Sequence, residues 1–250
     1  MGILRAFFNN TRKPEGLLGR CMVGSMNRAH AALADWGLSH LPETGPTEIA
    51  ELGCGGGRNI RVLLRKYPAA TVAALDYSEV SVEKAMRVNR KGLQAGRCRI
   101  IQGDVSCLPF EDGAFDLVTA FETVYFWPGP TESFREVYRT LRPGGIFVQV
   151  LAGQNHLPGL KAIIYPAHVE KEKTLHPALP GFGLLHTQTL RFSFSLPDAQ
   201  SVHDLLYMTP HVWRITKRGA EALAQTAQLT DTAEVIFNIY GRQEAGNLLE

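Results

Sequence analysis

The sequence has few cysteines, no long apolar run and little net charge, and each scarcity argues against a class of protein. The four cysteines, Cys21, Cys54, Cys98 and Cys107, form no Cys-x-x-Cys pair and have no histidine at ligand spacing, so we expect neither a zinc site nor a disulfide framework. No stretch approaches the roughly 18 apolar residues of a membrane span, and residues 1–8 are too short for a secretion signal. We therefore expect a cytoplasmic protein with no membrane partner. A formal net charge of +2 gives no bulk reason to expect nucleic acid.

An apolar strand, residues 47–52, runs directly into a glycine-rich turn and then into a helix. Gly53, Gly55 and Gly57 leave no Cβ where the chain must bend and where a ligand can touch backbone. A dinucleotide fingerprint would need a small residue at position 58, which is Arg58. The turn alone leaves open an NAD-type ligand, another nucleoside ligand, and a purely structural bend.

A carboxylate follows the next predicted strand, about 20 residues beyond the glycines. Asp76 stands where a ribose-binding acid is expected in a β-α-β unit, which favours an adenosine-containing ligand over an empty turn. NAD would use the same residue, so Asp76 does not separate the two cofactors. Ser78 is predicted to cap a helix over residues 79–94.

Four segments, taken in order, resemble the motifs of the class I S-adenosylmethionine (AdoMet)-dependent methyltransferases. They are Glu51-x-Gly-x-Gly-x-Gly57, Gly103-Asp-Val105, the Leu108–Val118 segment, which contains Leu-Pro-Phe and then Phe-Asp, and Arg142-Pro-Gly-Gly145. The resemblance covers residues 47–150. It implies an α/β fold with a doubly wound, seven-stranded, mostly parallel sheet, and AdoMet as the cofactor.

The resemblance also implies a cofactor site, in which Asp104 bonds the adenine amino group and Val105 covers the ring. The cofactor-binding residues would be Glu51, Gly53, Cys54, Gly55, Gly57, Asp76, Tyr77, Ser78, Gly103, Asp104, Val105, Phe121 and Glu122. No catalytic residue is assigned. A general base is needed only if the acceptor arrives protonated, and the candidates are Glu122, Tyr125, His156 and His168.

The acceptor is expected to bind at the carboxyl edge of the sheet, where ligands bind in open α/β folds. Candidate acceptor-binding residues are Tyr125, Trp127, His156 and Tyr165. Residues 1–46 are expected to form a helical cap before a methyltransferase domain of residues 47–250. In that cap a helix over residues 22–41 would either simply pack on the edge of the sheet or place Met26, Asn27 and His30 toward the cofactor, as pre-core helices do in many methyltransferases.

The second half of the chain supports two acceptor classes. Residues 155–165 and 205–214 resemble the bacterial 23S rRNA guanine-N1 methyltransferases, a likeness that covers about residues 150–240. Those enzymes carry a four-cysteine zinc module that this chain lacks, and residues 122–127 look more like small-molecule enzymes. A small-molecule acceptor is therefore preferred, with rRNA as the alternative. A non-catalytic AdoMet-binding module stays open, and Arg58 disfavours an NAD-dependent oxidoreductase.

Periodicity predicts the remaining elements. The last two strands, residues 189–196 and 232–240, alternate apolar and polar side chains and are expected to form an antiparallel pair that closes the sheet. Helices are expected over residues 198–208 and 216–228 between them. Residues 154–183 have no clear pattern.

Overall fold

The structure, a computed structural model, describes residues 31–43, 45–165, 174–207 and 209–243. Its strands are β1 (Glu48–Leu52), β2 (Thr71–Asp76), β3 (Cys98–Gln102), β4 (Phe115–Phe121), β5 (Leu141–Ala152), β6 (Phe182–Leu196) and β7 (Leu229–Arg242). Its helices are α3 (Ala31–Ser39), α4 (Arg58–Lys66), α5 (Glu79–Val88), α6 (Arg90–Gln94), α7 (Pro130–Thr140), α8 (Pro158–Ile164), α9 (Ala199–Tyr207) and α10 (Lys217–Ala224), with 3₁₀ turns η1 (Val124–Phe126) and η2 (Pro210–Trp213).

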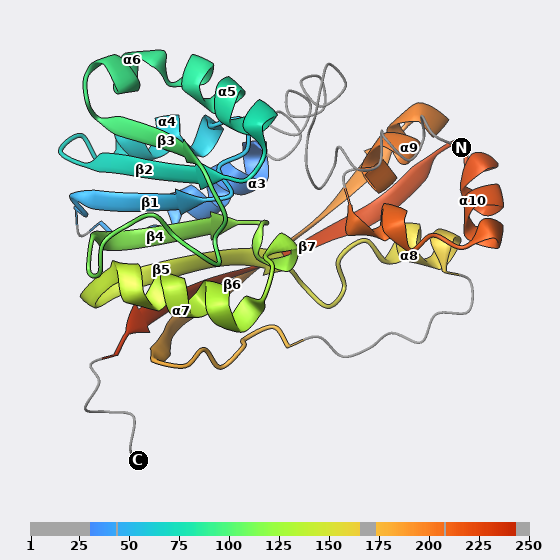
Figure 1. Ribbon diagram of the computed structural model, residues 1–250. Helices are drawn as coiled ribbons and strands as arrows, with labels where there is room; N and C mark the ends of the chain where they lie inside the picture. The colour runs from blue at the N-terminus through green and yellow to red at the C-terminus, as the bar shows by residue number, and fades with distance from the viewer. Residues whose placement is uncertain (1–30, 44, 166–173, 208, 244–250) are drawn as a thin grey trace.

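The seven strands form one sheet in the order β3-β2-β1-β4-β5-β7-β6 (Figure 1). The first five are parallel, whereas β7 runs antiparallel to both β5 and β6. This confirms the mostly parallel sheet and the antiparallel closing pair expected from the sequence. The order of the strands reverses at β1, where β1 lies between β2 and β4, so the carboxyl ends of these strands form the expected ligand edge.

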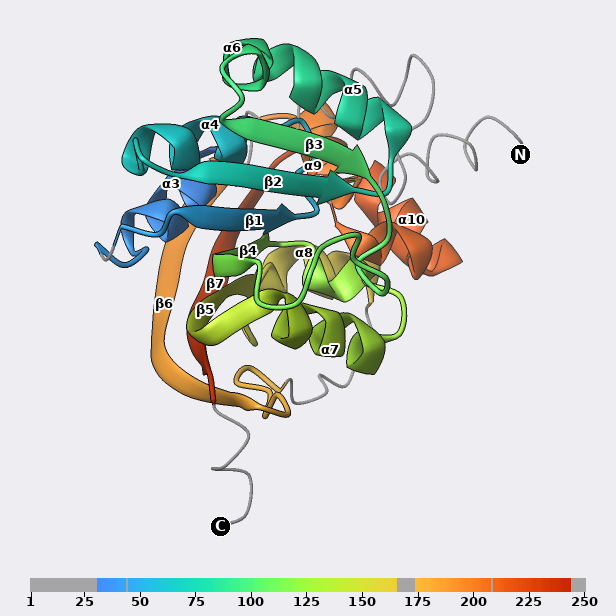
Figure 2. The same cartoon turned by 60° about the vertical axis from the view of Figure 1, so that its left-hand side comes forward.

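Strict alternation along the strands gives the sheet two buried faces. Ile49 and Val72 pack with α3, α4 and α5 in one apolar cluster, whereas Ala50 and Ala73 pack with α7 in the other. Figure 2 shows α7 on the side of the sheet opposite α3 and α4. Helices therefore cover both faces, as a doubly wound sheet requires.

A separate lobe extends past the carboxyl ends of the parallel strands (Figure 1). β5 ends at Ala152 opposite Val235, whereas the β6–β7 pairing continues to Leu196 opposite Leu229. We call this extension, together with α8, α9, η2 and α10, the outer lobe. Its own apolar cluster includes Leu160, Val202, Leu206 and Leu223. The lobe thus has a small core of its own beside the predicted ligand edge.

Two elements differ from the sequence-based expectation, and a third is described only in part. The helix predicted over residues 79–94 is divided into α5 and α6 at Asn89, whose amide donates to the carbonyl oxygens of Gly57 (2.8 Å) and Ala85 (2.9 Å). α8 lies in the segment that showed no pattern. Of the helix predicted over residues 22–41, the described part is α3, which ends at Ser39.

Candidate functional site

The glycine turn between β1 and α4 combines two packed glycines with one that faces open space. A Cβ on Gly53 would lie 2.4 Å from Thr123 Cγ2, and one on Gly57 would lie 2.7 Å from Ala85 Cα. A Cβ on Gly55 would meet no atom within 4 Å, although its φ of +50° still disfavours other residues. Gly53 and Gly57 therefore serve packing, whereas the Gly55 backbone faces open space.

Asp76 is buried at the carboxyl end of β2 and fixes the glycine turn. Its Oδ2 accepts the N–H of Gly55 at 2.8 Å, and its Oδ1 accepts the N–H of Ser78 at 2.9 Å. Burial raises the pKa of Asp76, and these two backbone donors oppose the shift. Each oxygen keeps a second lone pair that a ribose hydroxyl can use. Ser78 accepts the N–H of Ser81 at 3.3 Å, which confirms the predicted helix cap.

Glu51 lies behind the turn and joins three elements. Its side chain accepts from Asn59 on α4 at 3.0 Å and contacts the hydroxyl of Thr119 on β4. Burial raises its pKa to about 7, against the effect of these two partners. Burial also raises the pKa of the Cys54 thiol well above its usual value, and the carboxylates of Asp76 and Glu51 add to that shift. The structure thus groups two acids around the turn.

The segment after β3 contributes an exposed acid at the same edge. Asp104 Oδ1 accepts the N–H and the hydroxyl of Ser106, both at 2.8 Å, so one carboxylate oxygen closes a local turn. Val105 is buried, and Gly103 has Leu75 2.9 Å from the position of a Cβ. Tyr77, across the edge on the β2–α5 turn, is 37% exposed. The roles of these residues toward adenine stay predictions.

The loop after β4 holds a strained acid next to the glycine turn. Glu122 has φ +55° although it is not a glycine, and its N–H donates to Val150 O at 3.0 Å. Thr123 donates to Leu52 O at 3.1 Å, which fastens the loop to the end of β1. Tyr125 is 46% exposed, whereas Trp127 packs on Phe134 and Phe147 in the core. An acceptor role is easier to reconcile with Tyr125 than with Trp127.

The other two candidate acceptor residues belong to the β5–α8 connection and the outer lobe. His156 Nδ1 lies 2.9 Å from the backbone oxygen of Glu234, and Tyr165 Oη lies 3.3 Å from His211 Nδ1. The Glu234 carboxylate accepts the N–H of Asn155 at 2.8 Å and Nε of Arg191 at 2.8 Å. These contacts fix the root of the outer lobe against the end of β5.

The loops at this edge are acidic. Residues 53–57, 76–78, 103–106, 121–127 and 152–157 contain no lysine or arginine. The nearest arginine along the chain, Arg58, is paired with Asp35 through an Nη2–Oδ2 contact of 2.5 Å. A cationic ligand is compatible with this edge, whereas a diphosphate would meet like charge. AdoMet therefore fits this edge better than NAD does, given the bare Gly55 backbone, the available lone pairs of Asp76 and the acidic loops.

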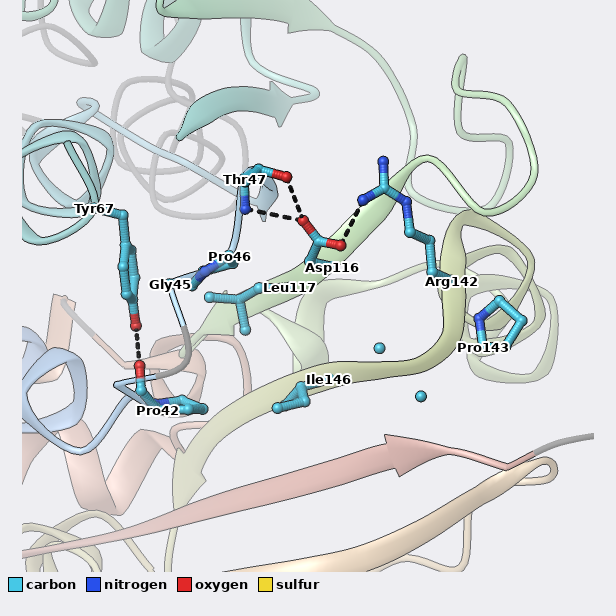
Figure 3. A pocket seen from close by; sticks show the side chains of 12 residues that line it. Pro42, Gly45, Pro46, Thr47, Tyr67, Asp116, Leu117, Arg142, Pro143 and Ile146 are labelled. Atoms are coloured by element: carbon cyan, nitrogen blue, oxygen red, sulfur yellow. Dashed lines mark hydrogen bonds and ion pairs between the residues drawn. The ribbon is translucent and has the colours of Figure 1, made fainter. Parts of the chain in front are cut away.

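A cavity of about 340 Å³ lies at the opposite, amino edge of the sheet (Figure 3). Its polar groups are satisfied by one another: Asp116 accepts from the N–H and hydroxyl of Thr47 at 2.9 Å each and pairs with Arg142 at 2.5 Å, and Tyr67 donates to Pro42 O at 2.7 Å. Ligands of open α/β folds bind at the carboxyl edge, so we regard this cavity as structural.

Some residues that hold the glycine turn could not be predicted from the sequence, and some predicted residues lie outside the described part of the chain. Thr119, Thr123 and Asn89 hold the turn through contacts across 32 to 71 residues, and no local pattern marks them. Met26, Asn27, His30 and His168 lie outside the described residues.

No group of three or more His, Cys, Asp or Glu in the described part of the chain could hold a metal ion. No helix among these residues is both long and apolar enough to cross a membrane.

Part of the chain is similar to known methyltransferases. Residues 50–149 match the family model described as a methyltransferase domain. Cycloartenol-C-24-methyltransferase 1 of Oryza sativa subsp. japonica is 32% identical over 100 residues, which are 40% of this chain and 29% of that protein. A sterol 24-C-methyltransferase of Aspergillus fumigatus is 32% identical over 101 residues, 40% of this chain and 26% of that protein. The chain thus matches less than a third of each relative.

The fold is shared more widely. The crystal structure of the YcgJ protein from Bacillus subtilis superposes with a TM-score of 0.57 at 16% identity, covering 86% of this chain and all of that one. The fold and the matched segment together resemble a class I AdoMet-dependent methyltransferase domain. That domain includes β1 to β4 and most of β5, and the outer lobe lies outside the matched segment.

Proposed function

We propose that the protein transfers a methyl group from AdoMet to a small-molecule acceptor. The observation that carries this proposal is the glycine turn, in which Asp76 orders a Gly55 backbone that faces open space. A bend alone would not need the buried carboxylate of Asp76 beside it. The match of residues 50–149 to a methyltransferase domain gives the same chemistry.

The chain's own contribution is binding, alignment and exclusion of water. When bound, AdoMet supplies a methyl group on a sulfonium, so the leaving group is a neutral thioether and little covalent chemistry is required of the protein. Asp76 would hold the ribose, Asp104 the adenine and the glycine turn the amino-acid end. Tyr125 and the loop after β4 would help align the acceptor, since reacting atoms must meet in line at about 3 Å. The outer lobe would shield this step from water.

Two observations support a small molecule as the acceptor. The loops at the ligand edge carry no basic side chain, and a polyanion would be repelled there. The two sterol methyltransferase relatives have small-molecule acceptors by their names, although each shares only part of its length with this chain. The cytoplasm stays the predicted location, which fractionation of cells that express a tagged chain would test.

One observation favours RNA as the second candidate. The two segments that resemble rRNA guanine-N1 methyltransferases, residues 155–165 and 205–214, meet in the outer lobe through Tyr165 and His211. Arg214 lowers the pKa of Tyr165 against the larger, opposing effect of burial, so a basic group lies near this contact. An RNA acceptor would then bind the lobe rather than the acidic edge, and its affinity would fall with salt.

The test is methyl transfer from labelled AdoMet into cell extract, separated into RNA, protein and small-molecule fractions. We expect label in the small-molecule fraction, and less label with an Asp76→Ala variant when AdoMet is below saturation. Label confined to 23S rRNA would replace the small-molecule proposal by the RNA alternative. AdoMet binding with no S-adenosylhomocysteine formed in any extract would indicate a non-catalytic binding module.

A further inference from the structure

Arg58, the residue directly after the glycine turn, forms an ion pair with Asp35. Gly37 of α3 packs on Phe121 and Val150, at the carboxyl ends of β4 and β5. Asp35 stands two residues earlier on α3, and Arg58 meets it from the first residue of α4. Arg58 therefore lies three residues past Gly55 in the sequence, and the ion pair with Asp35 fixes its guanidinium between α3 and α4.

The two terminal nitrogens of this guanidinium differ. Nη2 donates to Asp35 Oδ2 at 2.5 Å. Nη1 is shielded from solvent and has no hydrogen-bond partner among the residues that the structure describes. Leaving a buried charged donor unpaired is costly, and folded proteins seldom do so without a bound group to receive it.

The proposed cofactor carries a matching group. Besides its sulfonium and ammonium, AdoMet has one carboxylate, on the amino-acid end that the glycine turn would receive. The carboxylate of Asp76, which accepts from Gly55 in that turn, would repel this group, so a cation nearby would help to hold it. No other arginine or lysine occurs between residues 47 and 60.

We infer that Arg58 binds the carboxylate of the methionine part of AdoMet through Nη1, while Asp35 positions the guanidinium through Nη2. The inference rests on the proposed function and extends it, because it assigns a residue that discriminates among adenosyl ligands. A guanidinium fixed on one side by a carboxylate is well suited to this task, since its planar fork can serve two acceptors at once.

The test compares AdoMet with decarboxylated AdoMet, which keeps the sulfonium and the ammonium but lacks the carboxylate. Calorimetry gives the ratio of the two dissociation constants for the wild type, Arg58→Gln, Asp35→Asn and the control Arg61→Gln. Arg61 is exposed on the same helix, one turn further on. Circular dichroism and thermal melting show that each variant is folded.

We expect Arg58→Gln to weaken AdoMet by roughly 10- to 100-fold and to leave decarboxylated AdoMet nearly unaffected, so the ratio collapses. Asp35→Asn should reduce the ratio in part, and Arg61→Gln should not change it. An unchanged ratio in Arg58→Gln would overturn the inference while leaving the proposed function intact. A wild type that binds neither ligand would contradict the proposed function, and the inference with it.

Discussion

At the residue scale, Asp76 has a double role that gives a measurable signature. It orders the glycine turn by accepting from Gly55 and Ser78, and it would also bind the ribose. We predict that Asp76→Ala lowers AdoMet affinity by about 1–3 kcal/mol, measured by calorimetry, because charged hydrogen bonds are lost. The same variant should lower the free energy of unfolding. An unchanged affinity would contradict its place in the site.

Glu51 gives a pH-dependent prediction. Its pKa is about 7 in the folded chain against an ordinary value of 4.5, so the folded state holds a proton that the unfolded state releases. The Thr119 hydroxyl contacts both Ala50 O and Glu51 Oε2, but it has only one hydrogen to donate. Both contacts are hydrogen bonds if Thr119 donates to Ala50 O and a protonated Glu51 donates to Thr119. The stabilising contribution of Glu51 is thus full below pH 4.5 and is lost as pH rises to about 7.

A Glu51→Gln variant stays neutral and should escape that loss. Relative to the wild type, its free energy of unfolding should improve by about 2–3 kcal/mol between pH 5 and pH 8, as urea denaturation at each pH would show. A difference that is constant over this range would mean that Glu51 titrates normally.

Glu122 tests backbone strain at the loop after β4. Because its φ is +55°, glycine should fit that backbone better than alanine, which reverses the usual order of the two residues. We predict that Glu122→Gly is more stable than Glu122→Ala by about 1 kcal/mol in denaturant melts. Both variants lose the side chain, so the comparison isolates the backbone; alanine being the more stable would argue against a left-handed conformation.

At the element scale, the outer lobe is fastened to the sheet by two acids on β7. Asp231 accepts the N–H groups of Gly159 (2.9 Å) and Leu160 (2.7 Å) at the start of α8, and Glu234 joins Asn155 to Arg191. Both acids are buried. The position of α8 beside the ligand edge therefore depends on side chains that lie about 70 residues further along the chain.

We predict that Glu234→Gln lowers the free energy of unfolding by about 1–3 kcal/mol. The carboxylate accepts hydrogen bonds from the Arg191 guanidinium and the Asn155 backbone, and a neutral amide would bind these donors less strongly. Ser193→Ala is the matched control: Ser193 is exposed on β6, and its hydroxyl lies 3.5 Å from that of Thr232. We expect that control to stay within about 0.5 kcal/mol of the wild type. Equal effects of the two variants would show that Glu234 is not an anchor.

These elements also show where sequence reasoning ends. Glycine spacing and strand periodicity are local, so the turn after β1, the Ser78 cap and the antiparallel β6–β7 pair could be predicted. The break at Asn89 and the placement of α8 depend on side chains that reach distant backbone, which no local pattern encodes. For the same reason the sequence did not indicate that Trp127 packs in the core.

At the scale of the whole molecule, a sheet that matches a methyltransferase domain over residues 50–149 carries an outer lobe beyond that segment. The acidic edge of the sheet would select the cofactor, whereas the outer lobe, in which Tyr165 contacts His211, would select the acceptor. This division explains why the cofactor could be predicted from four motifs and the acceptor could not. Loops and lobes that vary on a constant scaffold commonly carry specificity.

We propose that the acidic edge with the glycine turn binds AdoMet and not a dinucleotide. Calorimetric titration of the purified chain with AdoMet and, separately, with NADH tests it most directly. We predict saturable binding of AdoMet at one site, weakened by Asp76→Ala, and no heat of binding from NADH. Binding of NADH without binding of AdoMet would contradict the account.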